Sequence, residues 1–281
     1  MTDYWSETFL QRLAHEPAVL ITVTRAQGSV PREAGTAMGV FALGETGTIG
    51  GGHLELQAIS LARQGLSGEP LPAGEQRHAL GPSLGQCCGG VVFLAFEKVG
   101  PPDVARLRQR LEIARAPVAL FGGGHVGRAL VKVLVELPLA IRWIDSRDAI
   151  FPPGLPPHLL CEQSDPVQSA VMDLAPGSRV LIMSFSHAED LEIVAACLQR
   201  LRQHDDLPFI GLIGSASKWA RFRHRLEARG YGPQECARVT CPIGIAGIAG
   251  KEPAVIAVAV AAQLLQIPWV PDGSETARTN M

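Results

Sequence analysis

The strongest constraint on the fold is a glycine motif at residues 122–127 (Gly-Gly-Gly-His-Val-Gly), between a predicted strand and a predicted helix. An apolar run at residues 118–121 precedes the motif, and a pattern of helical period covers residues 125–137. In such a turn the first glycine makes the bend, the second lets a phosphate approach, and the third lets helix and strand pack closely. Asp145 ends the next predicted strand, where an acid that binds a ribose belongs. These features predict a Rossmann-type domain. Such a domain often binds a dinucleotide, but the fold also hosts ligands of other kinds.

Strand and helix patterns alternate through the second part of the chain. Other strands are expected at residues 140–144, 179–184 and 209–213, and other helices at residues 103–114, 188–202, 218–228 and 253–265. Such alternation specifies a parallel sheet with helices on both faces. The predicted fold class is therefore α/β, with a Rossmann-like, doubly wound parallel sheet in the C-terminal domain.

The first part of the chain has a different pattern. Strands are expected at residues 18–24, 37–43 and 91–96, and helices at residues 6–15 and 54–63. A Gly-Pro-Pro-Asp break at residues 100–103 separates these elements from the alternating part. We therefore predict a smaller α+β domain at residues 1–100 and the Rossmann-like domain at residues 101–281.

Composition and charge argue against several classes of function. The 281 residues are 47% hydrophobic and 19% charged, which is typical of a folded globular protein. The formal net charge of −2 argues against a nucleic-acid partner, because such proteins normally carry a basic excess. No apolar run reaches about 18 residues, and residues 1–10 lack a signal-peptide core. We therefore expect a cytoplasmic protein without a membrane partner, whose six cysteines are free thiols.

Two adjacent cysteines, Cys87 and Cys88, stand in the run Gly-Gln-Cys-Cys-Gly-Gly at residues 85–90. Glycine allows backbone shapes that other residues resist, so one thiol of the pair can be turned toward a ligand. A thiolate is a nucleophile and a soft metal ligand, which suits a soft-metal cofactor or a sulfur-transfer step. The alternative is that both cysteines are small, buried hydrophobic residues.

A second glycine turn, at residues 50–52, precedes His53, Glu55 and the helix expected at residues 54–63. The start of that helix offers N–H groups to a phosphate or another anion. The alternative is a tight strand-to-helix turn that holds no ligand. In the first case His53 and Glu55 would flank the anion.

Polar residues also follow the later strands. Two positions are open for His187. It lies in the crevice at the carboxyl edge of the sheet, or it lies in solvent next to a Ser186 that caps the helix. Ser215 is expected to cap the next helix, with Lys218 either facing an anionic ligand or lying on the surface. Cys241 is a second candidate thiol, in a glycine-rich loop before the last helix.

Together and in this order, these segments resemble the XdhC/CoxI family of xanthine dehydrogenase accessory proteins. The resemblance rests on residues 28–32 (Gly-Ser-Val-Pro-Arg), 50–55, 85–90, 121–127, 186–187, 211–215 (Gly-Leu-Ile-Gly-Ser) and 241–244 (Cys-Pro-Ile-Gly). It implies a molybdenum-cofactor chaperone rather than an enzyme. Such a protein binds molybdopterin, holds it while a cysteine desulfurase adds the terminal sulfido ligand, and delivers it to the molybdenum subunit of apo xanthine dehydrogenase.

The resemblance also implies proteins of cofactor biosynthesis as partners, and a homo-oligomer is expected. No catalytic residue is predicted. Cys87 and Cys88 are the candidate contacts to molybdenum. The candidate cofactor-binding residues are Gln86, Cys87, Cys88, Gly50, Gly51, Gly52, His53, Glu55, Gly122, Gly124, His125, Gly127, Asp145 and His187.

Two alternative functions remain open. An NAD(P)-dependent oxidoreductase would use the glycine motif at residues 122–127, with Asp145 as the ribose ligand. A redox-regulatory module would oxidise the Cys87–Cys88 pair, although a disulfide between neighbours closes a strained ring. Titration with NAD(H) and NADP(H), and thiol counts before and after a mild oxidant, separate these alternatives from the cofactor carrier.

Overall fold

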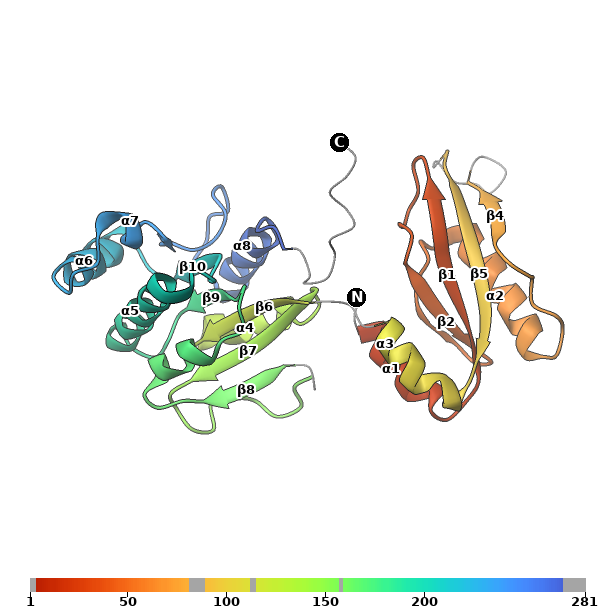
Figure 1. Ribbon diagram of the computed structural model, residues 1–281, viewed down its shortest axis with the longest axis horizontal. Coiled ribbons are helices and arrows are strands. Elements are labelled where there is room, and N and C mark those ends of the chain that lie inside the picture. Colours follow the sequence, from red (N-terminus) through yellow and green to blue (C-terminus); the bar gives the residue numbers. More distant parts are fainter. Residues whose placement is uncertain (1–3, 81–88, 112–114, 157–158, 270–281) are drawn as a thin grey trace. The chain divides into compact units, whose positions relative to one another are not determined.

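The computed structural model describes residues 4–80, 89–111, 115–156 and 159–269. The chain divides into two compact units, Met1–Ile113 and Ala114–Met281 (Figure 1). Each unit contains a β-sheet of its own.

The first unit is built on an antiparallel sheet with the strand order β3-β2-β1-β5-β4. Its elements are α1 (Tyr4–Leu13), β1 (Ala18–Gln27), β2 (Ala37–Phe41), β3 (Glu45–Gly47), α2 (Gly52–Leu66), β4 (Gln76–Ala79), β5 (Val91–Val99), η2 (Pro101–Asp103) and α3 (Val104–Arg110). In β1, Val19, Ile21 and Val23 pack with α2, whereas Ala18 and Leu20 pack with α1 and α3. Both faces of this central strand are buried, so it appears in the sequence as one continuous apolar run.

Helix α3 belongs to the first unit. Leu107 of α3 is fully buried beside Phe9 and Leu13 of α1. The Gly-Pro-Pro-Asp segment at residues 100–103, where a domain break was expected, forms a 3-10 turn that leads into α3. The unit extends beyond this turn because the apolar side of α3 completes its core.

The second unit contains a parallel sheet with the strand order β11-β10-β9-β6-β7-β8. Its elements are β6 (Ala116–Phe121), α4 (His125–Leu134), β7 (Leu139–Asp145), β8 (Leu160–Gln163), η3 (Val167–Asp173), β9 (Arg179–Ile182), α5 (His187–His204), β10 (Phe209–Leu212), α6 (Ala216–Glu227), α7 (Pro233–Cys236), β11 (Val239–Thr240) and α8 (Pro253–Leu265). Strand β6 pairs with both β7 and β9, so the strand order reverses there. This is the order of a doubly wound Rossmann sheet, and the predicted fold class is confirmed for both units.

Helices cover both faces of the parallel sheet (Figure 1). Leu120 and Leu181 pack with α4 and α8, whereas Phe121 and Ile182 pack with η3 and α5. This alternation follows the two-residue period of a strand. Among the described residues, no helix combines the length and the apolar character that crossing a bilayer requires.

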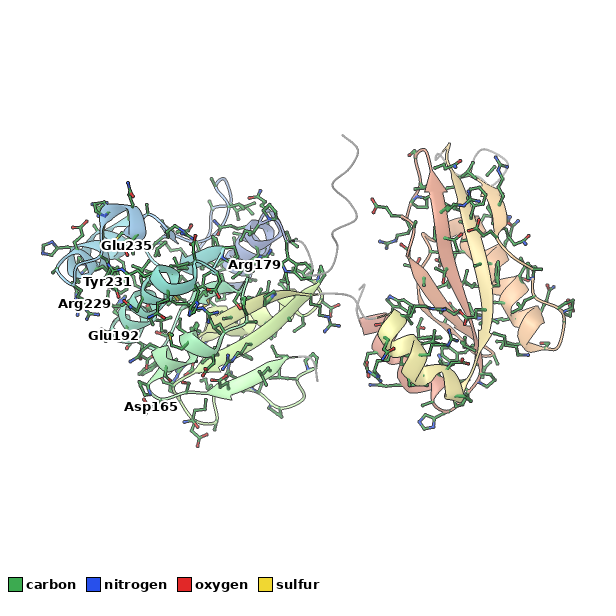
Figure 2. The ribbon with its side chains drawn as sticks, in the orientation of Figure 1. Asp165, Arg179, Glu192, Arg229, Tyr231 and Glu235 are labelled. Atoms are coloured by element: carbon green, nitrogen blue, oxygen red, sulfur yellow. The ribbon has the colours of Figure 1, made fainter. Side chains whose placement is uncertain are left out.

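The chain after α6 folds back onto α5 through polar contacts (Figure 2). Arg229 donates to both carboxylate oxygens of Glu192, at 3.0 and 2.7 Å, and the Tyr231 hydroxyl donates to the carbonyl of Ala195 at 3.0 Å. These bonds hold the segment after α6 against α5.

Candidate functional site

The turn between β6 and α4 requires glycine for steric reasons. Gly122 has a φ of +121°, and a Cβ at this position would collide with the carbonyl of Met183, just after β9. A Cβ on Gly127 would collide with the carbonyl of Gly122. The motif therefore allows β6, β9 and the first turn of α4 to approach one another at the switch point of the sheet.

Asp145 binds back onto this turn. Its Oδ2 accepts a hydrogen bond of 2.6 Å from the backbone N–H of Gly123 and one of 2.8 Å from Arg147 Nη2, and its Oδ1 accepts one of 2.8 Å from Arg147 Nε. Burial alone would raise the pKa of Asp145, but these bonds and the Arg147 charge hold it below its ordinary value. The predicted ribose ligand is therefore an ionised carboxylate that already has protein partners on both oxygens.

A cavity of about 270 Å³ opens at the start of α4. It is lined by Gly123, Gly124, His125, Arg128, Arg147 and Ile150. The Arg128 guanidinium donates to the carbonyls of Gly123 and Ile150, at 3.2 and 2.9 Å, and no described carboxylate lies within ion-pair distance of it. No described side chain caps α4 at Gly124, so the first N–H groups of the helix stay available. Within the described part of the chain, the cavity therefore combines a helix N-terminus with a guanidinium that has no carboxylate partner, which suits an anion.

The starts of α5 and α6 are closed by their own side chains. Ser186 Oγ accepts a hydrogen bond of 3.2 Å from the backbone N–H of Glu189, and Ser215 Oγ accepts one of 3.2 Å from that of Lys218. The predicted cap at Ser215 is confirmed, and the capping alternative at Ser186 is also found. His187 is exposed, and its ring lies edge-on to Phe222. Of these three helix starts on the carboxyl edge, α5 and α6 have a side-chain cap, whereas α4 has none from the described residues.

A buried ion pair at this edge was not predicted. Lys218 Nζ donates to Asp190 Oδ2 at 2.6 Å and to the carbonyl of Ile213 at 2.9 Å. The other carboxylate oxygen of Asp190 accepts from the backbone N–H and the hydroxyl of Ser184, at 2.9 and 2.7 Å. The pair joins the ends of β9 and β10. The sequence does carry a signal for this pair, because Asp190 follows the end of β9 and Lys218 follows the end of β10.

The glycine turn of the first unit is occupied by its own glutamate. Glu55 Oε2 accepts hydrogen bonds from the backbone N–H groups of Ile49 and Gly51, at 2.9 and 3.1 Å, and from the Thr48 hydroxyl. Gly50, Gly51 and Gly52 all have positive φ angles, which aim these N–H groups inward. A carboxylate from within the chain therefore takes the position that one of the two alternatives gave to an external anion. His53 is exposed, with its Nε2 3.0 Å from Gln57 Nε2.

Three motifs of the first unit meet near the end of β1. Gly50 lies against Pro31, and Gly90 lies against the carbonyl of Ser29. Gly89 and Gly90 directly follow the cysteine pair in the chain. Gln86, Cys87 and Cys88 themselves lie outside the described residues.

Burial disfavours the reactive thiolate form of the described cysteines. Burial raises the pKa of Cys197 to about 12. It also raises the pKa of the other described thiols, Cys161, Cys236 and Cys241. No group of three or more His, Cys, Asp or Glu side chains that could hold a metal occurs in the part of the chain that the structure describes.

Comparison with known proteins agrees with this architecture. Residues 118–264 match the family model of the XdhC Rossmann domain, and residues 11–72 match that of the XdhC and CoxI family. A crystal structure of a Bacillus halodurans protein, described as a xanthine dehydrogenase, superposes with a TM-score of 0.73. The two chains are 19% identical, and the superposition covers 95% of this chain and 96% of that one, so the likeness concerns the fold.

The chain is also 28% identical over 258 residues to YqeB, an uncharacterised protein of Escherichia coli strain K12. The alignment covers 89% of this chain and 43% of YqeB, so this chain spans less than half the length of that relative. Fold and comparisons together define a two-unit α/β protein whose second unit is a Rossmann domain. The chain belongs to the XdhC and CoxI family.

Proposed function

We propose that this protein is a molybdenum-cofactor chaperone, with no catalytic turnover of its own. It binds molybdopterin with its metal, shields it while a cysteine desulfurase supplies the terminal sulfido ligand, and delivers it to the molybdenum subunit of apo xanthine dehydrogenase. Family membership supports the connection to xanthine dehydrogenase. Proteins of cofactor biosynthesis and a second copy of the chain complete the proposed set of partners.

The observation that carries the proposal is the open start of α4. Molybdopterin ends in a phosphate, and the cavity offers the N–H groups at Gly124 and His125 together with the Arg128 guanidinium. Gly122 and Gly127 let the strands and the start of α4 approach closely, which forms the turn beside the cavity. The residues present therefore fit the phosphate end of the cofactor.

The thiols of Cys87 and Cys88 are proposed to contact the metal end of the cofactor. A thiolate is a soft ligand, which suits molybdenum and its sulfido group. Gln86 and His53 are proposed polar contacts in the first unit, and His187 is a proposed polar contact in the second unit. In this scheme Glu55 holds the glycine turn in its shape, since its carboxylate already binds the turn.

Gly124→Val tests where the phosphate binds. Gly124 lines the cavity and a Cβ there meets no atom within 4 Å, so we expect the added side chain to occupy space that the phosphate would need. We expect titration of the full chain with inorganic phosphate to show binding by the wild type, at least about fivefold weaker in Gly124→Val and in Arg128→Ala. Arg221→Ala is the matched control, because Arg221 is an exposed arginine outside the cavity. Equal phosphate binding by wild type and Gly124→Val would contradict the proposed site.

An NAD(P)-dependent oxidoreductase is the second candidate, because the strand order and the glycine motif are those of dinucleotide sites. The hydrogen bonds of Asp145 to Gly123 and Arg147 disfavour it, since a ribose would have to displace them. An arginine near this acid suits the 2′-phosphate of NADP better than the free ribose of NAD. Micromolar binding of NADP(H) together with hydride transfer would replace the chaperone proposal.

A further inference from the structure

Phe185 is an aromatic residue exposed at the carboxyl edge of the parallel sheet. It follows β9 directly after Ser184, next to the turn that Gly122 forms at the switch point. The residue is 66% exposed, although it lies in a unit with a large apolar core. An exposed aromatic ring at the ligand-binding edge of a Rossmann sheet is placed to contact a ligand.

The backbone around Phe185 is held in place from two sides. Glu189 Oε2 accepts a hydrogen bond of 3.2 Å from the backbone N–H of Phe185, and Glu189 Oε1 accepts one of 2.7 Å from the Ser146 hydroxyl. Glu189 therefore joins the turn after β9 to the turn after β7. The aromatic ring stands on a braced turn, which lowers the entropy lost when a ligand stacks on it.

Arg147 connects Phe185 to the cavity at the start of α4. Its guanidinium lies over one face of the Phe185 ring, with its central carbon 4.6 Å from the centroid, so a ligand would stack on the opposite face of the exposed ring. The same side chain lines the cavity and donates to both oxygens of Asp145. The cavity, the Arg147 guanidinium and the Phe185 ring thus follow one another along the edge of the sheet.

Flat heterocycles bind to surfaces of this kind. Aromatic rings and guanidinium planes both stack on the faces of nitrogen heterocycles, and such stacking does not depend on one particular pattern of hydrogen bonds. We infer that Phe185 and Arg147 form a stacking site for a flat nitrogen heterocycle, a pterin or a nucleobase, whose phosphate occupies the cavity at the start of α4. This inference rests on the proposed function, because it assigns the phosphate of the same ligand to that cavity.

The test is a fluorescence titration of the full chain with 6-hydroxymethylpterin monophosphate, while the binding of AMP and of inorganic phosphate is measured in parallel by calorimetry. We expect stacking on the wild type to quench the pterin fluorescence. Phe185→Ala should abolish the quenching and weaken binding of the preferred heterocycle by about tenfold or more. Binding of inorganic phosphate should stay within about twofold of the wild type, and Phe185→Trp should restore the quenching. The heterocycle that binds more tightly identifies the ligand as a pterin or a nucleotide.

Leu160→Ala is the control, because it removes a similarly exposed apolar side chain (59%) from the same unit. If Phe185→Ala binds both heterocycles as tightly as the wild type while inorganic phosphate still binds, the stacking site is wrong and the phosphate site stands. If the wild type binds neither phosphate nor either heterocycle, the proposed phosphate site fails and the stacking site fails with it.

Discussion

At the scale of single residues, steric requirements and hydrogen bonds shape the helix starts at the carboxyl edge of the parallel sheet. Gly122 and Gly127 occupy positions that exclude a side chain, and Ser215 caps its helix as expected. Asp145 ends its strand as predicted. Nothing in the sequence indicated that Arg147 would bind back onto it, because an Asp-x-Arg segment looks the same whether the arginine faces its neighbour or the solvent.

The thiols give a prediction at this scale. Because burial raises the pKa of Cys161, Cys197, Cys236 and Cys241, these residues carry little thiolate at neutral pH. We expect brief alkylation of the native protein with iodoacetamide at pH 7, followed by peptide mass spectrometry, to place the fast label on Cys87 or Cys88. Unfolding in urea should equalise the labelling of all six cysteines. Fast native labelling confined to the four described thiols would count against a reactive pair.

At the scale of elements, the buried strands and most helices could be predicted, but the edges of the sheets could not. The strands missing from the sequence prediction are β3, β4, β8 and β11, which form the edges of the two sheets. Each has two to four residues and no continuous apolar run. Edge strands are short and half-exposed, so they lack the pattern that identifies a buried strand. The crossover before β9 is the 3-10 segment η3, which the sequence prediction also lacks.

Arg200 of α5 holds this crossover in place. It is 4% exposed and donates to the carbonyls of Val171 and Leu174, at 2.7 and 2.8 Å, and to both oxygens of Asp206. We expect Arg200→Met to lower the free energy of unfolding by about 3–5 kcal/mol at pH 7, because it leaves buried acceptors and a carboxylate without their donor. Urea denaturation of the full chain measures this loss.

The control for Arg200→Met is Arg202→Met on the same helix, whose ion pair with Glu235 is exposed. It should change stability much less. The sign of the pH dependence follows from the hydrogen bonds of Arg200, which lower the pKa of Asp206. Stability from this pair is present above the ordinary aspartate pKa and is lost as the pH falls through the lowered value. The difference between wild type and Arg200→Met should therefore shrink in acid. If Arg200→Met and Arg202→Met lowered the free energy of unfolding by similar amounts, the buried bonds of Arg200 would contribute no more than an exposed ion pair.

At the scale of the whole molecule, the order of the motifs along the chain predicted both the fold class and the family, and both are confirmed. The sequence could not show which glycine turn remains open to a ligand. The turns at Gly50 and at Gly122 both begin Gly-Gly-Gly-His, yet Glu55 fills the first and the second opens on a cavity. The difference depends on where one carboxylate folds back, which is a property of the tertiary structure.

The central claim is that this chain carries the molybdenum cofactor, and the most direct measurement is the molybdenum and pterin content of the protein after purification from a cell that makes the cofactor. We predict nearly one molybdenum and one pterin per chain in the wild type, with a marked loss of both after combined Cys87→Ala and Cys88→Ala substitution. A wild-type protein that retains neither molybdenum nor pterin, yet binds NADP(H) and transfers hydride, would contradict the account.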